Sequence, residues 1–211
     1  SSDRHTTSSF QKLIADTSSK ASMAYTLFYH TSCKGFTGRA AAPYMMLEHT
    51  GSEFALKGKE DLAVDTCFAP PMLAFPDGST IAQTSAMCIA LGQEVGLAPK
   101  DPAASRKAMQ LTCDAADVLS DMGKGDERLA KWIAHLEACL SAPYFCGADL
   151  SYADFAVYAS MLGLDFKAAV DLPKLLEAAP KLAQWNAEMK DVEGVKKVLA
   201  TGVPILPESF K

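Results

Sequence analysis

The stretch from Pro99 to Pro102 divides the chain into two parts with different patterns of apolar residues. Before it, short aromatic and β-branched runs at 24–30 and 53–56 are typical of strands, and they flank a segment with helical spacing at 39–49. After it, the apolar residues have helical spacing and no strand alternation. We therefore predict an α/β unit that begins β-α-β, followed by an all-α unit.

The segment between the β-α-β unit and Pro99 is predicted to form a hairpin and a helix. Asp77-Gly78 lies between the runs 68–75 and 80–83, and an Asp-Gly pair in this position is a strong hairpin signal. A helix is expected from Ser85 to Val95. The first unit is thus predicted to end β-β-α.

One helix start in the second unit is marked by several side chains. Ser151 can cap the helix, Asp154 can reach back to it, and Leu150 with Phe155 can form a hydrophobic staple. The helix that follows, through Leu164, is apolar on nearly every side, so we expect it at the centre of a bundle. Ser151 and Asp154 are therefore interpreted as folding residues and not as catalytic ones.

Composition argues against several classes of protein. Lys and Arg total 20 against 25 Asp and Glu, with no dense basic run, which disfavours a nucleic-acid partner. No window approaches about 18 uninterrupted apolar residues, so no membrane-spanning helix is predicted. The 6 cysteines include no C-x-x-C pair and the 4 histidines are far apart. We read the cysteines as reduced thiols and expect no metal site.

The first 22 residues are rich in Ser and Thr and are interpreted as a polar N-terminal arm. Such an arm could be the remainder of a processed targeting segment, or the chain could simply have been shortened. We expect a cytoplasmic protein, with an organelle reached by a removed targeting segment as the alternative.

The order of elements and five motifs resemble the cytosolic glutathione transferase family, in particular its tyrosine-type, sigma-like members. The resemblance covers roughly residues 24–200. It implies a thioredoxin-like, glutathione-binding α/β domain over 23–97 and an all-α helical-bundle C-terminal domain over 98–211. The motifs, in chain order, are Pro71-Met72-Leu73, Asp77-Gly78, Gln83-Thr84-Ser85-Ala86, Ser151-Tyr152-Ala153-Asp154 and Pro180-Lys181-Leu182-Ala183-Gln184-Trp185.

The resemblance assigns glutathione contacts to four residues near the hairpin. A cis peptide bond is plausible at Pro71. The turn it makes would expose the backbone of Met72, which in the family pairs with the cysteinyl part of the tripeptide. Gln83 and Thr84 lie where a strand enters a helix, and by resemblance they hold the γ-glutamyl carboxylate. An ordinary helix cap at Thr84 is the alternative.

The expected reaction needs a thiolate, because a thiol of pKa about 8.5 is ionised to only a few per cent at neutral pH. A donor at the end of the first strand, near the first helix, would favour the anion. Tyr29 matches the tyrosine-type members and is our first candidate. Ser32 is second and Cys33 third, since both resemble the loop of serine- and cysteine-type members; Cys33 would shift the chemistry toward thiol exchange. The loop 31–37 is longer than in the tyrosine-type pattern.

Further contacts are implied by the resemblance alone. Lys57 or Lys59 is expected to meet the glycyl carboxylate. The loop after the first strand and the helices around Met109 to Met122 are expected to line the electrophile pocket. The family forms dimers in which one subunit's first domain faces the other's second domain. Asp114 lies where an acidic residue would approach the partner's glutathione.

The resemblance thus implies a glutathione transferase that conjugates the glutathione thiolate to a small electrophile, a detoxification reaction with glutathione as co-substrate and no metal. We expect a homodimer. The alternative is a catalytically degenerate transferase-fold protein that serves as a binding module or as a structural subunit of a larger assembly. A glutathione-dependent isomerase or peroxidase is a third reading.

Overall fold

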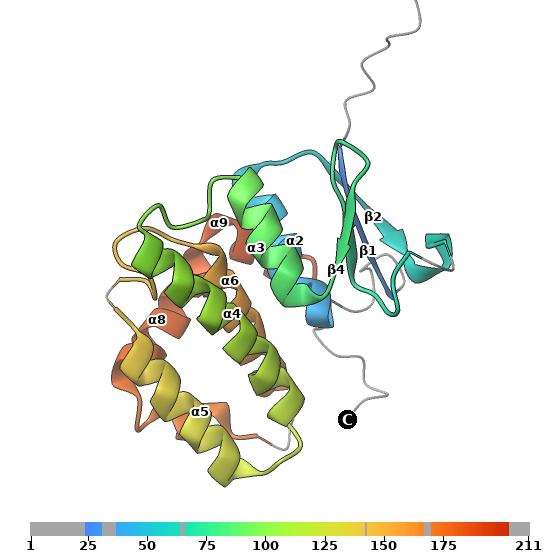
Figure 1. The fold of residues 1–211 in the computed structure, drawn as a ribbon. Coiled ribbons are helices and arrows are strands. Elements are labelled where there is room, and N and C mark those ends of the chain that lie inside the picture. The colour runs from blue at the N-terminus through green and yellow to red at the C-terminus, as the bar shows by residue number, and fades with distance from the viewer. Residues whose placement is uncertain (1–23, 31–36, 64–65, 142, 167–169, 203–211) are drawn as a thin grey trace, which may run out of the picture.

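The computed structural model describes residues 24–30, 37–63, 66–141, 143–166 and 170–202 (Figure 1). The predicted arm, Ser32 and Cys33 lie outside these residues. The chain forms a four-stranded mixed sheet with helices in its first part. The described residues of the rest form helices and one isolated β-bridge. The predicted fold class, a thioredoxin-like α/β part followed by a helical part, is confirmed.

The sheet has the strand order β2-β1-β3-β4. Strands β1 (Tyr25–Tyr29) and β2 (Phe54–Gly58) are parallel, as expected for a β-α-β unit. Strand β3 (Met72–Ala74) runs antiparallel to both β1 and β4 (Thr80–Ala82). The predicted β3–β4 hairpin is confirmed, and its turn is closed by the Asp77 carboxylate, which accepts the Ser79 N–H at 2.8 Å.

Helices α2 (Ala41–Thr50) and α3 (Thr84–Glu94) lie on one side of the sheet, toward the remaining helices (Figure 1). A short 3-10 turn, η2 (Gly38–Ala40), precedes α2, and a second, η3 (Lys59–Asp61), follows β2. Helix α2 is buried along most of its length because α3, α6 and α9 pack against it, and its Tyr44 ring contacts Phe54 of β2. A Cβ at Gly194 would collide with the Met45 carbonyl oxygen, so this glycine permits the close contact of α9 with α2.

The helical part surrounds α6, which is buried almost throughout, as its apolar sequence predicts. None of the helices in the described ranges is long and apolar enough to cross a membrane. The elements are α4 (Pro102–Asp121), α5 (Asp126–Cys139), α6 (Tyr152–Phe166), α7 (Leu172–Leu176), α8 (Pro180–Glu188), η4 (Met189–Asp191) and α9 (Glu193–Ala200).

The start of α6 is held by a fully buried carboxylate. One oxygen of Asp154 accepts hydrogen bonds from the Ser151 N–H at 2.9 Å and the Ser151 hydroxyl at 2.8 Å. The other accepts the Phe145 N–H at 3.0 Å, which ties a preceding loop to the helix. Burial raises the pKa of Asp154, and these hydrogen bonds oppose the shift. The interpretation of Ser151 and Asp154 as folding residues is confirmed.

Candidate functional site

The strand register gathers the ends of all four strands at one edge of the sheet. Lys57 of β2 and Met72 of β3 lie on either side of Phe28, one residue before the end of β1. The last residue of β4, Ala82, lies opposite Met72. Of the eight predicted site residues, six lie on or directly beside this edge: Tyr29, Lys57, Pro71, Met72, Gln83 and Thr84.

Tyr29 ends β1 and is directed to the start of the first helical segment. Its side chain is only 3% exposed, and its hydroxyl oxygen accepts the backbone N–H of Arg39 at 3.2 Å. Arg39 lies in η2, directly before α2. The tyrosine oxygen is therefore fixed where N–H groups at a helix start favour negative charge.

The start of α3 is open to an anion. Its N-cap residue, Gln83, makes no side-chain capping hydrogen bond, and the first turn holds no acidic residue. Gln83 has φ 71° and is the one non-glycine residue with positive φ in the described part of the chain. Such a conformation costs about 1–3 kcal/mol and occurs often at functional sites. The backbone strain and the uncapped helix start thus coincide at Gln83.

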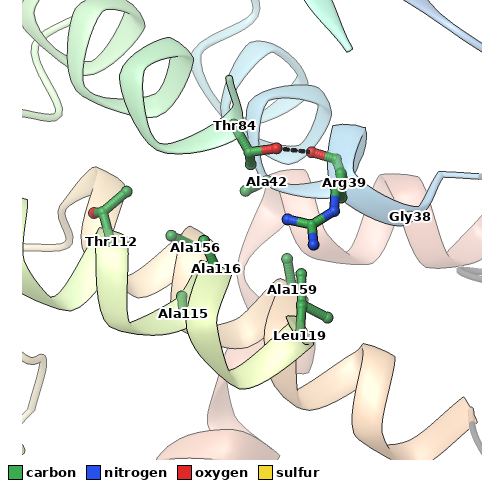
Figure 2. Close-up of a pocket in the computed structure, with 10 residues that line it drawn as sticks. All are labelled: Gly38, Arg39, Ala42, Thr84, Thr112, Ala115, Ala116, Leu119, Ala156 and Ala159. Atoms are coloured by element: carbon green, nitrogen blue, oxygen red, sulfur yellow. Dashed lines mark hydrogen bonds between the residues drawn. The ribbon is translucent and has the colours of Figure 1, made fainter. Parts of the chain in front are cut away.

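Thr84 does not act as the ordinary helix cap that was the alternative. Its hydroxyl donates to the Arg39 carbonyl oxygen at 2.9 Å, as the dashed line in Figure 2 shows. The hydroxyl therefore joins the start of α3 to η2. Arg39 is bonded through its N–H to Tyr29 and through its carbonyl to Thr84, so it holds these two predicted site residues together.

Two prolines shape the entry to β3. The Pro70–Pro71 peptide bond is cis, as considered from the sequence. Met72 lies inside the ladder between Phe28 and Ala82. In an antiparallel ladder both backbone groups of a residue point to the same neighbouring strand. The backbone groups of Met72 therefore point to a strand of the sheet. A peptide ligand at this edge would meet the two residues before Met72, Pro70 and Pro71, which offer carbonyl oxygens but no N–H.

The two candidate lysines lie at the end of β2. Lys57 is exposed, and its ammonium lies 5.9 Å from the centre of the Phe28 ring. Lys59 begins η3, and its charge, together with the larger effect of burial, lowers the pKa of His30. Because His30 directly follows Tyr29, the charge of Lys59 also acts near the end of β1.

A narrow cavity separates the sheet edge from the helical part. It encloses about 10 Å³, roughly the space of one water molecule. The Arg39 guanidinium extends toward α4 and donates to the Ser120 hydroxyl at 3.2 Å. The lining residues, drawn in Figure 2, are Gly38, Arg39, Ala42, Thr84, Thr112, Ala115, Ala116, Leu119, Ala156 and Ala159.

The α4 residues of this cavity fall inside the segment Met109 to Met122 that we expected to line an electrophile pocket. Asp114, expected near a partner's glutathione, accepts a hydrogen bond from Gln110 and lies 3.1 Å from His135 in its own chain. In the described residues, no group of three or more His, Cys, Asp or Glu is arranged to hold a metal ion.

The fold and the sheet edge define a class of protein: a thioredoxin-like part with its strand ends gathered beside a helical bundle. Residues 120–202 match the family model described as Glutathione S-transferase, C-terminal domain. No curated protein sequence matches the chain.

Solved glutathione transferases share the whole fold. The Pi-class enzyme of Onchocerca volvulus is 22% identical, with a TM-score of 0.69, over 87% of this chain and 97% of that one. The Ascaris lumbricoides enzyme is 22% identical, with a TM-score of 0.67, over 84% and 96%. A glutathione transferase homologue from Sulfitobacter, solved with bound glutathione, is 19% identical, with a TM-score of 0.63, over 86% and 99%. The domain match and the shared fold support the glutathione transferase family without assigning a subclass.

Proposed function

We propose that the protein is a glutathione transferase that conjugates the glutathione thiolate to a small electrophile. The observation that carries the proposal is the gathering of Tyr29, Lys57, Pro71, Met72, Gln83 and Thr84 at one edge of the sheet. These residues are far apart in the sequence, and the resemblance alone assigned them a common ligand. The match of residues 120–202 to the family's C-terminal domain supports the same function.

Tyr29 is the proposed donor to the thiolate. A phenol oxygen that accepts a backbone N–H is a better proton donor, because the accepted bond draws charge from the oxygen. Hydrogen bonding to the sulfur favours the anion, and each unit by which the thiol pKa falls needs about 1.4 kcal/mol. The thiolate then attacks the electrophilic carbon: a carbon–sulfur bond forms, and the leaving group departs with its electron pair.

The two carboxylates of glutathione have separate proposed positions. The γ-glutamyl carboxylate binds at the start of α3, at the backbone of Gln83 and Thr84, where a helix N-terminus stabilises an anion by about 0.3–1 kcal/mol. The glycyl carboxylate binds Lys57 or Lys59 at the end of β2. This places the tripeptide across the gathered strand ends, with its cysteinyl part at Pro70 and Pro71.

Two observations favour the second candidate, a transferase-fold protein that binds but does not conjugate. Pro70 and Pro71 supply no N–H donor to a peptide ligand. In addition, the described residues of the segment expected to line the electrophile pocket enclose only about 10 Å³ beside Arg39.

We also propose a homodimer, and two exposed apolar side chains support it. Phe68, between β2 and β3, is fully exposed, and Met109 on α4 is 45% exposed. One lies in the first part of the chain and the other in the helical part. A contact between the first part of one subunit and the helical part of another would cover both.

Calorimetric titration with millimolar glutathione tests the proposal. The purified protein, Tyr29→Phe and Ser32→Ala are compared, together with Tyr25→Phe as a matched control on the same strand. Thiolate formation is followed by ultraviolet absorbance, and conjugation is assayed with a panel of electrophiles. We expect binding in all four proteins and loss of the thiolate signal in Tyr29→Phe alone.

The other outcomes have definite meanings. Binding with neither a thiolate signal nor conjugation would establish a glutathione-binding module. Absence of binding at millimolar glutathione would refute the transferase, and co-fractionation of the native protein with a large complex would then favour a structural subunit. Loss of the signal in Ser32→Ala would transfer the donor role from Tyr29 to Ser32.

A further inference from the structure

A second cavity, of about 120 Å³, lies among α6, α7, α8 and η4 in the helical part of the chain. It is separate from the cavity beside Arg39, because the two share no lining residue. A cavity of about 150 Å³ in another protein holds a benzene ring, so this volume suits a molecule of about six to eight heavy atoms. The residues that line the cavity indicate what such a molecule would be.

The cavity is lined by a tyrosine whose hydroxyl has no partner. Tyr158 of α6 is fully buried. Its phenol oxygen forms no hydrogen bond in the described part of the chain. Unsatisfied buried hydroxyls are destabilising and rare in native structures. Burial, together with the charge of Asp165, raises the pKa of Tyr158 to about 12, so the protonated phenol can donate or accept a hydrogen bond.

Opposite charges line this cavity from different elements. Asp165 lies seven residues after Tyr158, on the same face of α6. Asn186 of α8 and Lys190 of η4 are four residues apart and line the cavity together. Asp165 and Lys190 are exposed, and neither forms an ion pair within the described ranges. The cavity thus has an acidic side on α6 and a basic side at η4.

The end of α6 adds to the acidic side. Asp165 lies in the last turn of this helix, which contains no basic residue. The last carbonyl groups of a helix carry partial negative charge, which favours a cation. An ammonium group is therefore the ligand group that best fits the Asp165 carboxylate, with the Tyr158 oxygen as a further acceptor.

Much of the remaining cavity wall is apolar. Met161 and Leu162 of α6 and Leu172 and Leu176 of α7 all line it. Met161 and Leu172 are buried, and the other two are half-buried. Such a wall favours a short aliphatic group, because apolar surface of the ligand is removed from water there.

We propose that this cavity binds a free α-amino acid with a small apolar side chain. The ammonium group contacts the Asp165 carboxylate and the Tyr158 oxygen. The carboxylate of the ligand contacts the Lys190 ammonium and the Asn186 amide, and the side chain lies against the apolar wall. Because both charged residues are exposed, water screens their attraction, and we expect millimolar affinity. The proposal is independent of the glutathione site.

Titrations of the full-length protein followed by NMR test the proposal. L-Valine is the probe, and two analogues keep its carbon chain: isobutylamine lacks the carboxylate, and isovalerate lacks the amine. We expect valine to bind about fivefold more tightly than either analogue, which is the upper range for one exposed ion pair. Absence of saturable valine binding at tens of millimolar ligand, or equal affinities for the three probes, would overturn the proposal.

Variants test the separate contacts. Asp165→Asn should abolish the preference for valine over isovalerate and keep that over isobutylamine, and Lys190→Gln should do the reverse. Tyr158→Phe should weaken valine binding about fivefold. It should also raise the Tm of the free protein, because a buried hydroxyl without a partner is removed.

A control separates these contacts from a general effect of charge. Lys196→Gln removes an exposed lysine on α9, outside the cavity, and should leave all three affinities unchanged. Circular dichroism checks that each variant is folded. The proposal would be refuted if both Asp165→Asn and Lys190→Gln kept the preferences of the wild type, or if Lys196→Gln altered them equally.

Discussion

Substitution of Asp154 by Asn should destabilise the protein strongly, although the two side chains have the same shape. The carboxylate accepts three hydrogen bonds from Ser151 and Phe145 and is fully buried. Asn has one carbonyl oxygen and one NH2 group. If the Asn oxygen accepts the hydrogen bonds from Ser151, its NH2 group points at the Phe145 N–H. Two donors then face each other in the interior, and neither has an acceptor.

The cost follows from these contacts. Asp154→Asn loses one hydrogen bond to a charged group and leaves a buried N–H unsatisfied, together about 3 kcal/mol. In a chain of this size each kcal/mol lowers Tm by about 2–4 °C, so we expect a fall of about 6–12 °C. Thermal and guanidinium unfolding followed by circular dichroism would measure both quantities.

A matched control isolates the effect of burial. Asp101 caps α4, where its carboxylate accepts the Ala104 N–H at 2.8 Å from an exposed position. Asn is as good an N-cap as Asp, so Asp101→Asn should change stability by less than about 0.5 kcal/mol. If Asp154→Asn and Asp101→Asn had equal effects, the reasoning from buried hydrogen bonds would be refuted.

Three further predictions concern other parts of the molecule. Burial lowers the pKa of His49 in the folded protein. Below the usual histidine pKa of about 6.5, the unfolded chain therefore binds more protons than the folded one. The free energy of unfolding falls as the pH drops through this value. His49→Gln should reduce this slope in unfolding curves measured on both sides of that pH, and an unchanged slope would contradict the assignment. Pro70→Ala adds an N–H donor at the sheet edge and should tighten glutathione binding about fivefold in calorimetry, with Pro76→Ala as control. No gain would argue against peptide pairing there. Phe68→Ser should shift the protein from dimer to monomer in sedimentation with little change in subunit stability, because this side chain is exposed. A monomeric wild type would refute the interface.

Most of the secondary structure could be predicted because its signals are local. Asp77-Gly78 specifies the hairpin within a few residues, and Ser151 with Asp154 specifies the start of α6. Most boundaries differ from the predictions by one or two residues, as at α3, where we expected Ser85 and the helix begins at Thr84. The largest difference is at β3, which begins at Met72 although the predicted run begins at residue 68.

The candidate site could be predicted only in part. The resemblance named residues on separate strands, and the sheet register brings them together. The bonds from Arg39 to Tyr29, Thr84 and Ser120 join positions far apart in the sequence, and no local pattern indicates them. The sequence shows that Pro70 has no N–H donor. It does not show that Met72 lies inside the ladder, which is why a peptide ligand would meet Pro70.

Arg39 explains how binding and conjugation can be separated in this protein. Its backbone N–H and carbonyl contact Tyr29 and Thr84, so a substitution of Arg39 that keeps the backbone N–H leaves both groups in place. Its guanidinium, by contrast, donates a hydrogen bond to the Ser120 hydroxyl. Arg39 also lines the cavity of about 10 Å³. In the proposed function, the sheet edge holds the thiol peptide, and the described residues leave little space for an electrophile beside Arg39. If the electrophile binds in this cavity, the two proposed functions differ in whether the exposed contact between Arg39 and Ser120 opens: a transferase requires it to open, and a binding module does not.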